Sequence, residues 1–268
     1  MQIIFDALRA ATALLFLFYA SWSDYKTREV SNTVWMAFAP LGFALAFLEI
    51  HIYDFSQLPF YGMCFGLTAA FAIILFYSGG FGGADAKALM CLALALPFHP
   101  EKLIKPFFGE ASPISQIFFP ITIFSNSVLL AAATAIYMLL RNMFWRQKTG
   151  KKLFERGLEG ESFGRKLLVL ATGYKLPIDR LKEKWHLYPL EDMENAENEL
   201  KRKLVLLPKE EGRDAIVKRL TKAVEDGKIQ NAVWATPGLP MLIFITLGLI
   251  IALFLGDIVW ICISFLLG

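Results

Sequence analysis

The sequence predicts an all-α polytopic membrane protein with about six transmembrane helices and a polar cytoplasmic module between the fifth and the sixth. Of the 268 residues, 56% are hydrophobic, whereas soluble domains are roughly 45–50% apolar. The mean hydropathy is +0.49, and several apolar runs approach the roughly 20 residues that a helix needs to cross a bilayer. A third observation is the uneven distribution of charge along the chain.

Most of the charged residues lie in one segment, 141–237. It contains 21 of the 27 Lys and Arg residues and 15 of the 24 Asp and Glu residues, which gives it a net charge of +6 against −3 for the remainder. Such a segment cannot lie in hydrocarbon. We therefore expect a transmembrane catalytic domain at 1–140, a cytoplasmic polar domain at 141–237 and a sixth transmembrane segment at 238–268.

The first span is expected at 3–20, where Asp6 and Arg9 are three residues apart and can pair on one helical face. A cleavable signal peptide is the competing interpretation, but Asp6 precedes the apolar core where a signal peptide carries positive charge. A polar hinge follows at 21–32. Asp24 lies in this hinge soon after the first span, and the hinge ends at Asn32, which we expect to be the N-cap of a second span near 33–50.

The third span is expected near 60–78. Four glycines and Asp85 then form the segment Ser78-Gly-Gly-Phe-Gly-Gly-Ala-Asp-Ala-Lys87. The fourth span, Ala86–Phe98, is short for crossing, so we expect it either to be buried against neighbouring helices or to extend back through Gly82-Gly-Ala-Asp85. Residues 99–114 indicate a loop or a re-entrant segment, and Ile114–Leu140 is the fifth span.

In the polar segment, helices are expected at Asp214–Asp226, followed by Gly227 as the C′ residue, and at Glu191–Leu207. Its glycines are not spaced as in a phosphate-binding loop, and its basic excess suits anionic lipid heads. The chain re-enters the membrane at 241–267, which we interpret as one span rather than a span followed by an interfacial segment. The three cysteines show neither disulfide nor zinc spacing.

The orientation follows from the rule that cytoplasmic loops carry the excess of Lys and Arg. If the basic segment is inside, the hinge at 21–32 and the glycine segment also lie inside, whereas the Lys- and Arg-free loop at 51–59 lies outside. Lys102 and Lys105 on the outer side count weakly against this arrangement. Asp24 and Asp85 are then on the same, cytoplasmic side, each beside a helix end.

Two carboxylates close together in a low-dielectric pocket can share one proton, and such a pair performs general acid–base hydrolysis of an amide. A structural interpretation of Asp85 as a helix cap is equally compatible with its glycine-rich surroundings. The histidines, His51, His99 and His186, are scattered, and no Ser–His or His–Glu pair has usable spacing. Asp24 and Asp85 are therefore the candidate catalytic residues.

Two motifs resemble those of a known family. Asp24-Tyr-Lys-Thr-Arg-Glu-Val-Ser-Asn32 and Gly82-Gly-Ala-Asp85-Ala-Lys87 are similar to the motifs of the GxGD membrane aspartyl proteases, specifically the type IV prepilin peptidase and archaeal preflagellin peptidase group. The resemblance covers the first five spans. It implies catalytic roles for Asp24 and Asp85 and motif support from Gly82, Gly83, Ala84 and Lys87. Ala84 stands where the stricter pattern has glycine.

The resemblance also implies the substrate. Because the chain lacks the paired C-x-x-C motifs of many bacterial prepilin peptidases, it resembles the peptidase-only archaeal kind, which removes the short basic leader from preflagellins (archaellins) and related pilins on the cytoplasmic side. Neither cofactor, metal nor nucleic acid is expected. Glu29 is a candidate for receiving the basic leader, with a solvated surface charge as its alternative role. Lys87 is expected either to orient Asp85 or to reach lipid phosphates.

Two other functions fit a membrane protein with such acids. An ion- or proton-coupled transporter would use the same two aspartates as ion sites. A noncatalytic assembly subunit would use the polar segment as a docking surface. The transporter interpretation predicts inverted repeats and acids in mid-span, and the sequence shows neither convincingly.

Overall fold

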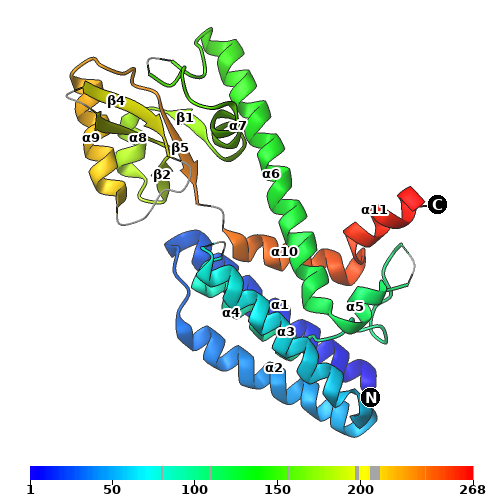
Figure 1. The fold of residues 1–268 in the computed structure, drawn as a ribbon. Coiled ribbons are helices and arrows are strands. Elements are labelled where there is room, and N and C mark those ends of the chain that lie inside the picture. Colours follow the sequence, from blue (N-terminus) through cyan, green and yellow to red (C-terminus); the bar gives the residue numbers. More distant parts are fainter. Residues whose placement is uncertain are drawn as a thin grey trace. The chain divides into compact units, whose positions relative to one another are not determined.

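A computed structural model describes residues 1–79, 81–108, 110–155, 157–196, 199–205, 212–238 and 240–267. The chain divides into two compact units, one made of Met1–Ala131 with Pro240–Gly268 and the other of Ala132–Leu239. Figure 1 labels their helices and strands. The division expected from the sequence, with a membrane domain at 1–140, a cytoplasmic domain at 141–237 and a last span at 238–268, stays a prediction.

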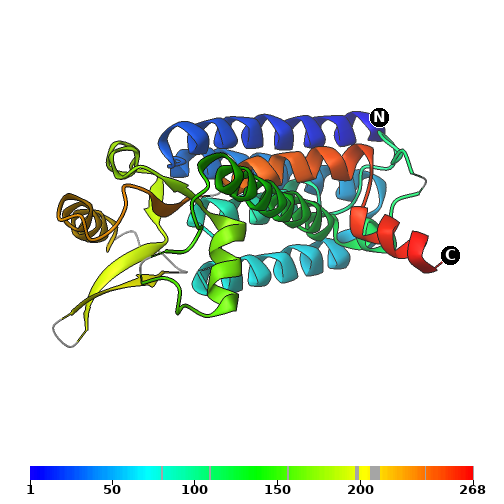
Figure 2. The same ribbon diagram turned by 90° about the horizontal axis from the view of Figure 1, so that it is seen from above.

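The first unit begins with four helices joined by short connections. They are α1 (Gln2–Thr27), α2 (Asn32–Tyr53), α3 (Leu58–Tyr77) and α4 (Gly83–Ala95), with the 3-10 turn η1 (Phe55–Gln57) between α2 and α3. Helix α4 contacts each of the other three, and α1 also packs against α10 (Met241–Phe254), beside which it lies in Figure 2. Because the connections are short, α1 ends where α2 begins, and α3 ends where α4 begins, at one end of the bundle.

Close approach of α2 and α4 depends on a glycine. A Cβ atom added to Gly42 would lie 2.8 Å from the Cβ of Ala95, which is closer than real Cβ atoms come. Small residues at such a crossing let two helix backbones meet, as is common in membrane helix pairs. Phe38 of α2 and Leu92 of α4 are fully buried in the same apolar cluster.

The expected fifth span is broken near its start. Helix α5 (Pro113–Ile117) ends at Phe118, and α6 (Phe119–Thr149) begins immediately after it. Pro120 stands in the first turn of α6, where the missing N–H costs nothing, and it cannot continue a preceding helix. Helix α6 also runs nine residues beyond the expected end at Leu140.

The last apolar run is bent. Helices α10 and α11 (Ile258–Leu267) meet at an angle of 52° across Leu255–Asp257. Gly256 has φ 92°, and the amide of Asn126 brackets the bend by donating to the carbonyl of Gly256 at 2.9 Å and accepting from the N–H of Ile258 at 3.1 Å. Asp257 is buried and accepts the Ser112 hydroxyl at 3.1 Å.

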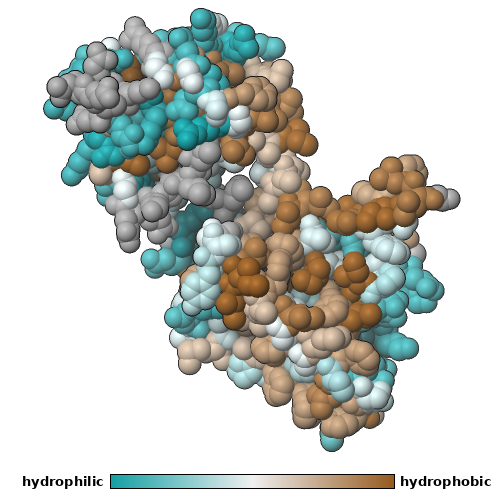
Figure 3. All heavy atoms as spheres, in the orientation of Figure 1, coloured by the Kyte–Doolittle hydropathy of each residue, from teal (hydrophilic) through white to brown (hydrophobic). Residues whose placement is uncertain are grey.

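The number of membrane spans differs from the expected six. Within the residues that the structure describes, four segments are long and apolar enough to cross, namely α1, α2, Phe55–Tyr77 and α6, and the bent pair α10–α11 would make a fifth. Helix α4 has 13 residues and is not among them. The six-span prediction is therefore not confirmed, although Figure 3 shows the hydrophobic surface of the helices of the first unit.

The second unit contains the rest of α6 and a mixture of short helices and strands, so the all-α prediction was wrong for this part of the chain. In chain order these are α7 (Phe163–Thr172), β1 (Tyr174–Leu176), α8 (Ile178–Glu183), β2 (Leu187–Pro189), β3 (Glu191–Ala196), β4 (Glu199–Leu204), α9 (Arg213–Glu225) and β5 (Val233–Pro237). One antiparallel sheet has the order β1-β5-β2, with Lys175 opposite Trp234. Apolar residues of α9 pack against this sheet, among them Leu220, which is fully buried.

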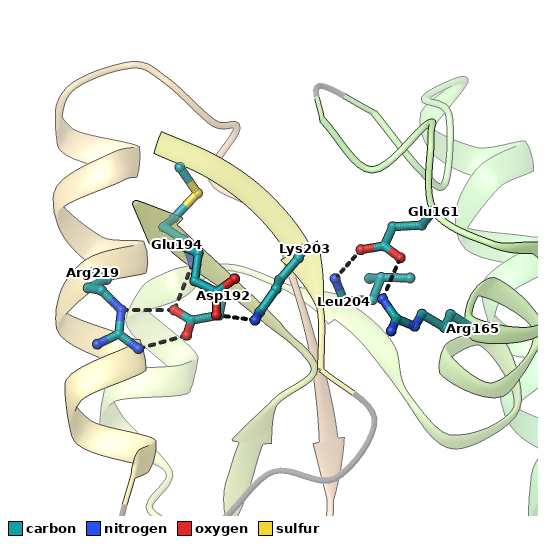
Figure 4. A network of polar contacts seen from close by, with 8 residues as sticks. Glu161, Arg165, Asp192, Glu194, Lys203, Leu204 and Arg219 are labelled. Carbon is teal, nitrogen blue, oxygen red and sulfur yellow. Dashed lines mark hydrogen bonds and ion pairs between the residues drawn. The ribbon is translucent and has the colours of Figure 1, made fainter. Parts of the chain in front are cut away.

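The helix expected at Glu191–Leu207 was wrong. Residues 191–196 and 199–204 form an antiparallel hairpin in which Glu191 is opposite Leu204, while 206 and 207 lie outside the described residues. Arg202 binds Glu191 through both side-chain oxygens, at 2.8 and 2.9 Å, and both side chains are almost fully buried. Figure 4 shows further interactions that hold the hairpin. The Arg219 guanidinium donates to the Asp192 carboxylate, and the N–H of Leu204 donates to the Glu161 carboxylate.

The helix expected at Asp214–Asp226 is confirmed as α9 (Arg213–Glu225), and Gly227 follows it with φ 68°. Ile216, Val217, Leu220 and Ala223 are its buried residues, as its apolar stripe predicted. Aspartate and lysine also lie at the ends that suit the helix dipole.

Candidate active site

Asp24 lies in the last turn of α1, next to a tight hinge. Arg28 closes the helix in a left-handed conformation with φ 58°, and its N–H donates to the carbonyl of Asp24 at 2.9 Å. The hydroxyls of Ser23 and Thr27 donate to the carbonyl of Glu29 at 2.8 and 2.9 Å. A carboxylate near a helix C-terminus is disfavoured by the helix dipole. The position of Asp24 is therefore poorly explained as helix stabilisation.

Asp85 lies in the first turn of α4 and is half-buried. Its carboxylate accepts the N–H of Gly82 at 3.1 Å. A Cβ atom added to Gly82 would lie 3.1 Å from the same carboxylate oxygen, so glycine leaves room for this contact. The capping role that the sequence allowed is thus observed, and it occupies the carboxylate only in part.

Burial dominates the electrostatics of Asp85, which lies outside the candidate spans. Loss of water around the carboxyl group raises its pKa to about 7, the Gly82 N–H bond opposes this rise, and the charge of Asp24 adds to it. Charge–charge effects weaken with distance. Asp24 is the smallest of these contributions, and the helix order places it at the same end of the bundle as Asp85.

A direct contact joins the two sequence motifs. The Lys87 ammonium donates to the side-chain oxygen of Asn32 at 2.7 Å, which ties the first turns of α4 and α2 together. The expected N-cap role of Asn32 was wrong, because the cap of α2 is Ser31, whose hydroxyl accepts the N–H of Thr33. Lys87 was expected either to orient Asp85 or to reach lipid phosphates. The sequence did not predict its hydrogen bond to Asn32.

The remaining motif residues surround this pair. Ala84 packs against the main apolar cluster of the first unit, and a Cβ atom on Gly83 would make an ordinary 3.6 Å contact with Phe76. Glu29 is exposed, and its role toward a basic leader stays a prediction. Of the four glycines before Asp85, Gly80 lies outside the described residues.

Sequence reasoning missed a polar contact one turn before Asp24. The hydroxyls of Ser21 on α1 and Thr246 on α10 are 2.7 Å apart and buried. Thr246 also donates within its own helix to Leu242. Thr246 is a polar residue in an apolar run, which is the signal that could have identified this contact. The contact fixes the end of α1 that carries Asp24.

A second polar region lies at the other end of the bundle. Arg9 pairs with Asp6, as the sequence predicted, and also with Glu49 at 2.7 Å. They line a cavity of about 500 Å³ together with His99. Because Asp6 is near the start of α1 and Glu49 near the end of α2, this cavity is remote from Asp24 and Asp85.

The sequence is similar to those of known proteins over most of its length. Residues 11–136 match the type IV leader peptidase family, and residues 165–258 match a family described as archaeal peptidase A24 C-terminus, type II. The chain is 28% identical to a preflagellin peptidase of Methanococcus voltae over 92% of this chain and 94% of that protein.

Two further relatives extend the comparison. A preflagellin peptidase of Methanocaldococcus jannaschii is 25% identical over 90% of this chain and 91% of its own length. A prepilin peptidase of Methanothermobacter thermautotrophicus is 28% identical over 63% of this chain and 43% of its own length. Both Asp24 and Asp85 fall inside the segment matched by the leader peptidase family.

Proposed function

Because the chain belongs to the type IV leader peptidase family, as its two aspartate motifs suggested, we propose that it is an aspartic endopeptidase that removes leaders from preflagellins or archaeal prepilins. Family membership supports a membrane peptidase. The observation that supports the aspartic mechanism is that Asp24 in the last turn of α1 and Asp85 in the first turn of α4 lie at the same end of the bundle, where burial also raises the pKa of Asp85 to about 7.

In the proposed reaction the two carboxyl groups share one proton, which Asp85 carries. Asp24 takes a proton from a water molecule as the water oxygen attacks the scissile carbonyl carbon, while Asp85 donates its proton to the carbonyl oxygen. The tetrahedral intermediate then breaks its C–N bond. Asp24 returns its proton to the amine, and Asp85 recovers one as the new carboxyl group forms.

The proposed reaction takes place on the cytoplasmic side. Lys26 and Arg28 belong to the hinge beside Asp24, and Lys87 lies beside Asp85, so this end of the bundle is basic, whereas residues 51–59 at the other end hold neither Lys nor Arg. The positive-inside rule favours placing such an end in the cytoplasm. The exposed Glu29 is then available to a basic leader.

The substrate proposal rests on the relatives. Two of them bear the name preflagellin peptidase and match nearly the full chain, whereas the prepilin peptidase matches a smaller share. We therefore place preflagellins first and prepilins second. The transporter alternative uses the same aspartates, and no observation on these residues favours it.

The test is cleavage of a preflagellin by full-length protein in membranes, with Asp24→Asn and Asp85→Asn made singly. Each variant should lose roughly 10²–10⁴-fold in rate, because this is what a general acid–base group typically contributes. Asp54→Asn is the matched control, since Asp54 is an exposed acid that caps η1 at the other bundle end. The new N-terminus is read by mass spectrometry.

Full cleavage by either variant would contradict the aspartic mechanism. Loss of membrane insertion would be detected separately by extraction and thermal unfolding, so that inactivity cannot be confused with misfolding. A transporter or assembly subunit that does not cut would leave the preflagellin intact with the unmodified protein as well.

A further inference from the structure

Helix α7 is attached to its unit by only one face. Ser162 caps it by accepting the N–H of Arg165 at 3.4 Å. Val169 is its buried residue and packs in an apolar cluster with Leu190 and Trp234. At its beginning, the Glu161 carboxylate bonds both the N–H of Leu204 and Arg165, at 2.9 and 3.1 Å (Figure 4).

The opposite face of α7 is apolar and open. Successive residues of a helix turn by about 100°, so that 163, 164, 167, 168 and 171 lie away from Val169. Phe163 is 81% exposed, Leu168 51% and Leu167 47%. The other two positions are glycine and alanine. Leaving such side chains in water is unfavourable relative to burying them, so we expect this face to be covered.

Contacts with helix α6 indicate the depth of α7 relative to the membrane. About 20 residues suffice to cross hydrocarbon, and α6 has 31, beginning at Phe119. Counted from that start, hydrocarbon ends near residue 139, about one turn before Asn142. The buried Asn142 amide donates to the carbonyls of Leu170 and Gly173 at 3.0 and 2.8 Å, which fixes the end of α7 at this level.

The residue types around this level match a membrane interface. Met143 and Phe144 are exposed apolar residues of α6, and they are followed by Trp145, Arg146 and Lys148. Aromatic and basic side chains in this order are typical of the headgroup region. Segment 141–172 holds eight Lys or Arg and three Glu residues, a net charge of +5.

The direction of α7 also suits a surface. In Figure 1, α7 is seen nearly end-on while α6 is seen along its length, so the two helices of this unit cross steeply. If α6 crosses the bilayer, α7 lies along the bilayer surface. Amphipathic helices in that orientation bury their apolar face at the boundary between headgroups and acyl chains.

We propose that α7 is an interfacial helix whose outward face, defined by Phe163, Leu167 and Leu168, inserts into the headgroup region of an anionic bilayer. The exposed Arg146, Lys148 and Lys151 supply the attraction to lipid phosphates. Arg165 and Lys166 border the face, although each also has a protein partner, Glu161 and the carbonyl of Glu159 respectively. This inference is independent of the peptidase chemistry.

The test uses spin labels on cysteines in the full chain, reconstituted in phosphatidylcholine bilayers containing phosphatidylglycerol. Cys262 is exposed and is replaced by serine, while Cys64 and Cys91 are buried. Labels are placed singly at the exposed Phe163 and Leu167, and at Lys218 of α9 as the control on an exposed polar face. Collisions with oxygen and with a water-soluble nickel chelate are compared.

Labels at 163 and 167 should meet oxygen preferentially, with an oxygen-to-nickel ratio severalfold above that at 218. The ratio should decrease when phosphatidylglycerol is omitted, because the basic residues lose their partners. Nickel access at 167 equal to that at 218 would overturn the proposal, since the face would then be in water. Low access to both reagents would overturn it too, because a protein or a second copy would cover the face.

Discussion

Asp85→Asn should separate two consequences of one carboxyl group, its proton chemistry and its cost to folding. Asparagine keeps an oxygen that can accept the N–H of Gly82, so the start of α4 should remain capped. The variant loses the titrating proton. We expect cleavage to be abolished and the protein to become more stable at neutral and alkaline pH.

The magnitude follows from the pKa of Asp85, which is about 7 in the folded protein against 3.8 for an ordinary aspartate. Below the lower value both states are protonated and the group has no effect. Between the two values the unfolded chain is ionised while the folded chain holds its proton, so stability decreases as pH rises and then levels off. The full difference corresponds to roughly 4 kcal/mol, which asparagine avoids.

The assay is thermal unfolding in detergent at about pH 5 and about pH 8.5, with cleavage measured on the same preparations. A gain of a few kcal/mol corresponds to several degrees in Tm for a chain of this size. The variant should exceed the unmodified protein clearly at the higher pH and much less at the lower. A variant that is equally stable or less stable at the higher pH would refute the burial argument, and retained cleavage would refute the catalytic role.

Three other predictions follow from the contacts of the site and of the second unit. Cleavage by the unmodified protein should decline as pH rises through about 7, because Asp85 loses the proton that it donates; a rate that is flat up to about pH 9 in a pH–rate profile would contradict this. Lys87→Met should reduce the cleavage rate more than the stability, by breaking the bond to Asn32 while both aspartates remain; kcat, KM and Tm measured together test it, with Lys26→Met as a control in the same basic region. Arg202→Met should destabilise the second unit by about 3–5 kcal/mol, because the buried Glu191 carboxylate loses the guanidinium that it binds. Limited proteolysis should detect this, whereas the double variant with Glu191→Met should recover much of the loss.

The length of the apolar runs predicted the first three helices well. The helices expected at 3–20, 33–50 and 60–78 correspond to α1, α2 and α3. Helix α4 begins at Gly83 but already ends at Ala95, so it is shifted along the chain and no longer than the expected Ala86–Phe98. Apolar length alone does not reveal a break, which is why the fifth span was drawn across Phe118. Pro120 was the available signal there.

Segment Glu191–Leu207 shows where local preference fails. Its Glu, Lys and Leu residues favour helix, yet the chain forms a hairpin because Arg202 and Glu191 pair across it and bury both charges. Such pairing depends on contacts that a single sequence does not display. Helix propensity is a weak prior that tertiary contacts override.

The sequence predicted which residues belong to the candidate site but not the hydrogen bonds between them. Glycines before an aspartate and a basic hinge after another identified Asp24 and Asp85 as a pair to examine, and their catalytic role stays a prediction. The bond from Lys87 to Asn32 joins residues 55 positions apart. No spacing rule links such positions, because the distance is set by the packing of α2 against α4.

The contact of Gly42 with Ala95 has a consequence for how this protein can change over generations. A single methyl group gained at 42 has nowhere to go unless 95 becomes smaller, and 95 is already alanine. In a library randomised at both positions, active members should therefore contain small residues in matched combinations. Variants with a bulky residue at either position should lose leader cleavage. The distance between α2 and α4 therefore depends on positions 42 and 95 together, and selection should act on the two residues as a pair.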